Sequence, residues 1–67
     1  MSYAVSSGGT FGVIERHYRT ETGVAMVVIR WGTLGWLTPV PWSEVRLLRS
    51  LYASEARAEA EEWLASR

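Results

Sequence analysis

The sequence contains no cysteine, which excludes disulfide bonds and thiolate metal ligands within the chain. It has a single histidine, His17, whereas a zinc site needs three or four protein ligands. Lysine, aspartate, asparagine and glutamine are missing too, so every cation is arginine and every anion is glutamate. This bias is typical of GC-rich coding in a bacterium or its phage. We therefore predict no metal, no cofactor and a reducing, cytoplasmic setting.

Long apolar runs and net charge are also lacking. No apolar segment approaches the roughly 18 residues of a transmembrane helix, and there is no basic signal-peptide start. Seven arginines balance seven glutamates, so the overall basic field of many nucleic-acid binders is absent. Residues 1–50 hold five arginines and three glutamates, while residues 51–67 hold two and four. We expect a soluble protein, with no membrane partner and a mild charge polarity.

The length of 67 residues predicts one small domain, spanning 1–67. A chain of this size buries only about 60% of the surface that it exposes when unfolded. Small domains usually gain stability from disulfides, a metal or a partner chain. Because the composition excludes the first two, we predict a homodimer.

The strongest structural signal is the apolar run from Val24 to Ile29, which is rich in β-branched residues. Apolar side chains on both faces predict a central strand that is covered front and back. Turn residues at 7–10, 20–23 and 32–33 separate this strand from its neighbours. We predict an antiparallel meander of three to four strands, at about 2–6, 11–19, 24–31 and 34–38, with a hairpin over 11–31.

A long C-terminal helix is predicted after the sheet, at about 41–65, which makes the fold class α+β. Pro39 and Pro41 end the sheet, and the residues after Trp42 are rich in alanine, glutamate, arginine and leucine. An apolar stripe of period 3.6 favours one continuous helix: Val45, Leu48, Tyr52, Ala56, Ala60 and Trp63. The alternative is a break near Ala53-Ser54 that folds the last segment back over its own sheet.

A helix of this length, about 36 Å, would extend beyond a small sheet, so its far end needs another surface. Two small residues one turn apart, Ala56 and Ala60, would let a second backbone come close. Trp63 and Leu64 would otherwise leave an apolar patch in water. We predict a dimer interface formed by Tyr52, Ala56, Ala60, Trp63 and Leu64.

No set of residues at a spacing typical of catalysis is present. His17 could lie near Glu15 and Glu21 in the hairpin, but one imidazole with two carboxylates is a weak metal or acid–base site. The serines have no histidine and carboxylate at a recognised spacing. We predict that the protein is not an enzyme.

Aromatic residues and arginines are abundant instead, with four Trp, three Tyr and one Phe in the chain. Arg16, Tyr18 and Arg30 lie on adjoining predicted strands, where guanidinium groups and a ring could stack on unpaired bases. Arg16 and Arg19 could contact phosphates. We therefore predict nucleic-acid binding by Arg16, Tyr18, Arg19 and Arg30. Surfaces of arginine and aromatic residues equally suit protein partners.

One pattern consists of Ile29-Arg30 at a strand end, Leu37-Thr38 at the end of the sheet, and Trp42 three residues before Val45. It resembles the single-stranded-DNA-binding transcriptional coactivators, over roughly residues 24–51. The family's basic hairpin is replaced here by Gly32-Thr33 alone. The resemblance implies a four-strand-plus-helix dimer whose helices pair and whose sheet faces nucleic acid, with Arg30 as a contact.

A second pattern consists of Gly12-Val13-Ile14, then Val28-Ile29-Arg30-Trp31-Gly32, then Pro39-Val40-Pro41-Trp42. It resembles SH3-like small barrels, although these do not require a long helical tail. The resemblance implies an aromatic groove that binds a peptide, with four candidate walls: Tyr18, Trp31, Trp36 and Trp42.

Together these features favour a small, non-catalytic nucleic-acid-binding protein, such as a DNA-binding regulator of transcription. The alternative is a protein–protein interaction module, for example a phage product that binds a host protein, or an SH3-like peptide binder.

Overall fold

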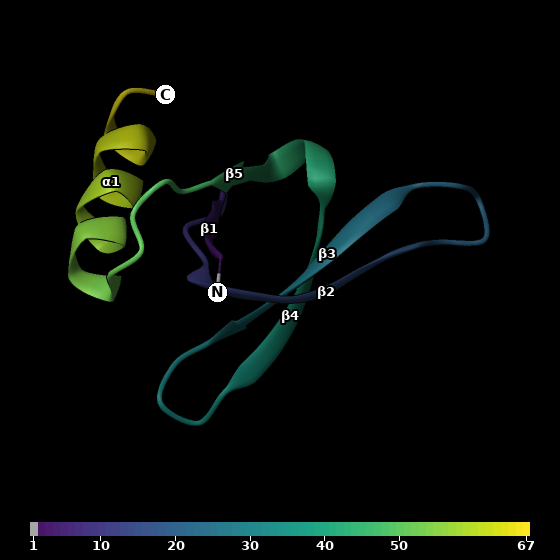
Figure 1. Ribbon diagram of the computed structural model, residues 1–67. Helices are drawn as coiled ribbons and strands as arrows, with labels where there is room; N and C mark the ends of the chain where they lie inside the picture. The colour runs from purple at the N-terminus through teal and green to yellow at the C-terminus, as the bar shows by residue number, and fades with distance from the viewer. Residues whose placement is uncertain (1) are drawn as a thin grey trace.

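The computed structural model describes residues 2–67 and forms one five-stranded sheet with a single helix on it (Figure 1). The elements are β1 (Tyr3–Ser6), β2 (Phe11–Arg19), β3 (Ala25–Trp31), β4 (Trp36–Pro41), a 3₁₀ turn η1 (Trp42–Glu44), β5 (Val45–Leu47) and α1 (Ala53–Ala65). The strand order is β4-β3-β2-β1-β5, and all neighbouring strands are antiparallel. The predicted α+β class, an antiparallel sheet followed by a C-terminal helix, is confirmed.

The β2–β3 hairpin is the longest arm of the sheet and extends away from the helix (Figure 1). Its turn is closed by the backbone N–H of Thr20, which donates to the Val24 carbonyl at 3.0 Å, and by Gly23 at a φ of 87°. The register shifts between Ile14 and Arg16, which leaves Glu15 as the extra residue of a β-bulge. After the bulge the side chains alternate regularly again, so Arg16 and Tyr18 lie on the same face of the sheet.

The middle of β3 is the centre of the fold, as its apolar run predicts. Val27 and Ile29 are fully buried, and Val28 is 4% exposed, so both faces of the strand are covered. Gly12 of β2 passes directly against this strand: a Cβ there would lie 3.0 Å from Ile29 Cγ2 and would collide with the Arg30 carbonyl oxygen. Only glycine allows this close approach of two backbones.

The sheet extends further along the chain than predicted, because β4 includes both prolines. Pro39 pairs with Val28 and Pro41 with Met26. Since β4 is an edge strand, the missing N–H groups of the prolines point away from β3 and break no hydrogen bond of the ladder. The prediction that the prolines end the sheet near Thr38 was therefore wrong, because β4 continues to Pro41.

The predicted start of the helix at about 41 is also wrong, since α1 begins at Ala53 and has 13 residues. Residues 42–44 form η1, and 45–47 form β5, which pairs with β1. Pairing with β1 satisfies backbone groups on both sides of a strand that would otherwise form an edge, and this tertiary contact overrides local helix propensity. The alternative of a break near Ala53-Ser54 is correct in placing a helix start there and the last segment over its own sheet, but no α-helix precedes it. The N-cap of α1 is Tyr52, without a side-chain hydrogen bond.

Helix α1 lies over β1 through its small residues. Ala56 and Ala60 are buried in a cluster with Val5 and Leu48. Four larger side chains border that cluster: Tyr3, Phe11, Trp63 and Leu64. The two alanines allow the helix to pack closely against its own sheet, so the chain itself covers Ala56 and Ala60 of the predicted dimer interface.

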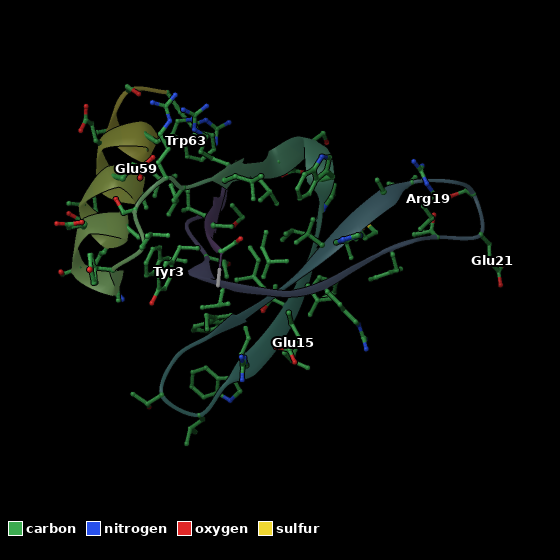
Figure 2. The ribbon with its side chains drawn as sticks, in the orientation of Figure 1. Tyr3, Glu15, Arg19, Glu21, Glu59 and Trp63 are labelled. Atoms are coloured by element: carbon green, nitrogen blue, oxygen red, sulfur yellow. The ribbon has the colours of Figure 1, made fainter. Side chains whose placement is uncertain are left out.

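A single carboxylate fixes the segment between β5 and α1. Glu59 Oε1 accepts hydrogen bonds from the backbone N–H groups of Arg49 at 3.0 Å and Ser50 at 3.3 Å, and from Ser50 Oγ at 3.3 Å. Figure 2 shows Glu59 on the helix beside this segment. Carboxylate–amide hydrogen bonds are among the stronger ones in proteins, so the helix and the segment are held in one position.

Over residues 2–67, the structure has no helix with both the length and the apolar character needed to cross a membrane.

The contact between Gly12 and β3 gives a test of the fold. We expect Gly12→Ala to lower the free energy of unfolding by about 2–4 kcal/mol, because the new methyl group overlaps backbone atoms that cannot rotate away. Gly8→Ala is the matched control, since a Cβ at Gly8 has only Ser6 Oγ nearby, at 3.8 Å. Urea unfolding followed by tryptophan fluorescence would measure both. Equal stability of the two variants would contradict the described packing of β2 on β3.

Candidate functional site

The candidate site surrounds Tyr18 and involves both faces of the β2–β3–β4 sheet: His17 and Arg19 alternate onto one face, Arg16 and Tyr18 onto the other. The antiparallel register forms two rows across the face that carries Tyr18, Arg16–Val28–Pro39 and Tyr18–Met26–Pro41. Directly paired residues have side chains on the same side of a sheet. The rows therefore bring an arginine and a tyrosine of β2 beside apolar side chains of β3 and β4.

Two open hollows lie on either side of Tyr18. The hairpin hollow, of about 320 Å³, is lined by His17, Tyr18, Arg19, Ala25, Met26 and Trp42. The strand hollow, of about 480 Å³, is lined by Arg16, Tyr18, Val28, Leu37 and Pro39. Tyr18 is 41% exposed and Trp42 is 44% exposed. Their rings are therefore available to a ligand while part of each remains packed.

The ionisable side chains that line the two hollows are basic: Arg16, Arg19 and His17. The Arg19 guanidinium donates a hydrogen bond from Nη1 to the Gly23 carbonyl at 3.0 Å, which holds it beside the hairpin turn. Glu21 lies at the tip of the hairpin and points away from the strands (Figure 2). A chain with zero net charge thus carries a local surface that combines positive charge with aromatic rings.

Arg30 is not part of this surface. Its Nε lies 3.1 Å from Glu15 Oε2, and the two side chains are 50% and 40% exposed. An exposed pair of this kind contributes little to stability, but it places an anion beside the cation. The structure therefore places Arg16 and Tyr18 along the strand hollow and Tyr18 and Arg19 along the hairpin hollow, and it leaves Arg30 outside both and beside a carboxylate.

The aromatic walls predicted for a peptide groove divide between the two ends of β3. Tyr18 and Trp42 share the hairpin hollow. Trp31 and Trp36 instead contact each other at the β3–β4 turn, with ring centroids 4.9 Å apart and planes at 60°. Trp31 Nε1 also donates to Thr38 Oγ1 at 2.7 Å. Trp31 therefore acts as part of the hairpin structure, whereas Trp36 is 52% exposed.

The residues predicted for a dimer interface have different environments. Ala56 and Ala60 are buried against the chain's own sheet, and Trp63 and Leu64 are half-buried at the same cluster. The Arg67 guanidinium lies 4.7 Å above the Trp63 ring. Tyr52 remains 69% exposed. Dimer formation itself stays a prediction, and of these five residues Tyr52 is the most accessible to a second copy.

His17, Glu15 and Glu21 do not converge, and nowhere in the described part of the chain do three potential metal-ligating side chains come together. The sequence analysis missed the contributions of Met26 and Leu37 to the hollows, and it named Trp42 only as a candidate wall of a peptide groove. Trp42 was assigned to a helix, which hid its position beside the hairpin. The exposed apolar side chains on β3 and β4 could have been found from strand alternation once the register was known.

Comparisons of the chain with protein families, with characterised proteins and with solved structures found no match.

The described surface predicts a division between residues that stabilise the fold and residues that form the site. We expect Tyr18→Ala and Trp42→Ala each to lower the free energy of unfolding by about 1 kcal/mol or less, because both rings are partly exposed. Ile29→Ala, which empties a fully buried position, should cost about 3 kcal/mol. Chemical unfolding of the three variants would show this order. A Trp42 variant as unstable as the Ile29 variant would show that Trp42 belongs to the core.

Proposed function

We propose that the protein binds single-stranded nucleic acid through the two hollows beside Tyr18. The observation that carries this proposal is that Arg16 and Tyr18 line one hollow, Tyr18, Arg19 and Trp42 line the other, and neither lining contains a carboxylate. Proteins that bind single strands combine stacking rings with cations that follow the phosphates. The proposed role is non-catalytic and regulatory, as in a DNA-binding regulator of transcription.

In this proposal one base stacks in the hairpin hollow, between Tyr18 and Trp42, and its neighbour lies against the apolar strand hollow. Base–aromatic stacking contributes about 1–3 kcal/mol for each base. Arg16 and Arg19 lie next to these positions on β2 and contact the phosphates. A duplex would fit less well, because its bases are already stacked and the chain offers few cations along a backbone.

Zero net charge limits the electrostatic part of binding. Two arginine–phosphate contacts predict a slope of about −1.4 for log affinity against log salt concentration, using the single-strand value of roughly −0.7 per phosphate. Binding should therefore be moderate and dominated by stacking. The proposal includes a cytoplasmic location, in keeping with the absence of cysteine.

A second candidate function is peptide binding, for which the hairpin hollow gives a specific reason. Tyr18 and Trp42, two of the four groove walls that the SH3-like resemblance implies, line this same hollow. In that case Tyr18 and Trp42 would be the walls of a groove for a proline-rich segment of a protein partner, such as a host protein bound by a phage product.

The main test is titration of the protein into a fluorescein-labelled oligothymidine of about ten nucleotides, followed by anisotropy at several salt concentrations. We expect Tyr18→Ala to weaken binding about tenfold through loss of stacking, with the salt slope unchanged. Arg16→Ala should weaken binding and reduce the slope by roughly 0.7. Arg67→Ala, which removes a cation on the Trp63 ring, is the matched control and should leave both quantities unchanged.

Three outcomes would speak against the proposal: no saturable binding at low salt, equal affinity for a duplex of the same length, or equal weakening by Arg67→Ala. Binding of a proline-rich peptide that depends on Tyr18 and Trp42 and varies little with salt would favour the second candidate.

The ion pair between Glu15 and Arg30 provides a further prediction. Glu15→Gln should free the Arg30 guanidinium and remove an anion from the neighbourhood of the strand hollow. We expect affinity for the oligothymidine to rise about two- to fivefold and the salt slope to become steeper. Glu21→Gln, at the hairpin tip, changes the net charge equally and is the control. If both variants change affinity equally, the effect is one of overall charge and Arg30 has no specific role.

A further inference from the structure

The folded chain exposes more surface than its mass predicts. Its accessible surface is 4817 Å². A compact monomer of 7.5 kDa should expose about 4,250 Å². The excess, about 570 Å², is smaller than the roughly 800 Å² that each partner contributes to a standard interface, which fits a small and weak one. Residues 2–67 include nine large hydrophobic side chains that are exposed, so part of this surface is suited to burial against another molecule.

One of the two sheet edges is closed to further pairing. Pro39 and Pro41 lie on β4, at the outer edge beyond β3. Since neither proline has an N–H group, two successive outward-facing positions of β4 cannot donate to an incoming strand.

The other edge, β5, offers a free donor and acceptor. The N–H of Leu48 donates to the Tyr3 carbonyl at 3.0 Å, and the N–H of Ser7 donates to the Glu44 carbonyl at 2.8 Å. Because backbone groups alternate along an antiparallel strand, those of Leu47 point away from β1. The next outward N–H, that of Val45, already donates to Trp42 within the turn. Leu47 is therefore the residue of β5 whose N–H and carbonyl both face outward for pairing.

We propose that two copies of the chain associate by antiparallel pairing of their β5 strands, with the two-fold axis at Leu47. The Leu47 N–H of each copy donates to the Leu47 carbonyl of the other, which makes two hydrogen bonds. Only this register of β5 on β5 pairs the free N–H and the free carbonyl of Leu47 in both copies. In this register Arg46 lies opposite Leu48 of the second copy, so no like charges are directly paired. The Leu47 side chains, each 48% exposed, face each other on one side of the joined sheets.

The segment after β5 supplies further apolar area at the same end of the sheet. Leu51 is 77% exposed and Tyr52 is 69% exposed, although both belong to a segment that Glu59 fixes through its backbone hydrogen bonds. Holding two large apolar side chains in water at a defined position reduces the entropy lost when they are buried by a partner. The pairing is distinct from the helix-to-helix contact predicted from the sequence, and only Tyr52 is common to both.

Sedimentation velocity of the full chain over about 10–500 µM tests this proposal, since a short interface gives a weak dimer. We expect the weight-average mass to rise from 7.5 kDa toward twice that value with concentration. Leu47→Glu places two carboxylates face to face and should raise the dimer dissociation constant at least tenfold, a loss of roughly 1.4 kcal/mol or more. Leu51→Glu should weaken the dimer as well.

Leu34→Glu is the matched control, because Leu34 is 76% exposed at the distant β3–β4 turn. Circular dichroism would verify that each variant is folded. A backbone readout is amide hydrogen exchange at Leu47, which should slow with rising concentration in the wild type. A monomer throughout the concentration range would overturn the proposal. So would a dimer that Leu34→Glu dissociates and Leu47→Glu does not, or Leu47 exchange that is independent of concentration.

Discussion

The pairing of β5 with β1 is the interaction on which the rest of the structure depends. It removes residues 45–47 from a helix that their composition would otherwise favour, and it gives the four-residue β1 a neighbour on each side. It also requires the chain to turn at Trp42 and places that ring beside the β2–β3 hairpin. The helix then begins only at Ala53 and packs against β1 through Ala56 and Ala60.

The distribution of charge in the structure matters more for the proposed function than the net charge of zero. Glu15 lies beside Arg30, Glu59 accepts backbone hydrogen bonds, and Glu21 lies at a hairpin tip (Figure 2). These positions leave Arg16 and Arg19 on a surface without a neighbouring carboxylate in its lining. A neutral chain can therefore present a local cationic surface, although it lacks the long-range attraction that a basic protein has for nucleic acid.

The two edges of the sheet illustrate how a small domain can direct its own contacts. Prolines close β4 to strand addition, whereas β5 has no proline and carries an exposed leucine. Such an asymmetry limits edge-to-edge association to one strand, which favours a closed pair over an open-ended assembly. The apolar side chains that remain in water are then divided between this edge and the separate surface around Tyr18.

The sequence by itself determined the local features: the buried β3 run, the hairpin turn at Gly23, the helical character of 53–65 and the absence of a cysteine-based site. These follow from residue periodicity and turn chemistry, which act over a few neighbouring residues. Only the tertiary structure decided the conformation of residues 39–52. The prolines fit in the sheet because β4 is an edge strand, and residues 45–47 form a strand because they pair with β1. The tertiary structure also decided which candidate contacts meet. Tyr18 and Arg19 share the hairpin hollow with Trp42, Arg16 lines the strand hollow, and Arg30 faces Glu15, since strand register and the bulge at Glu15 depend on contacts between distant parts of the chain.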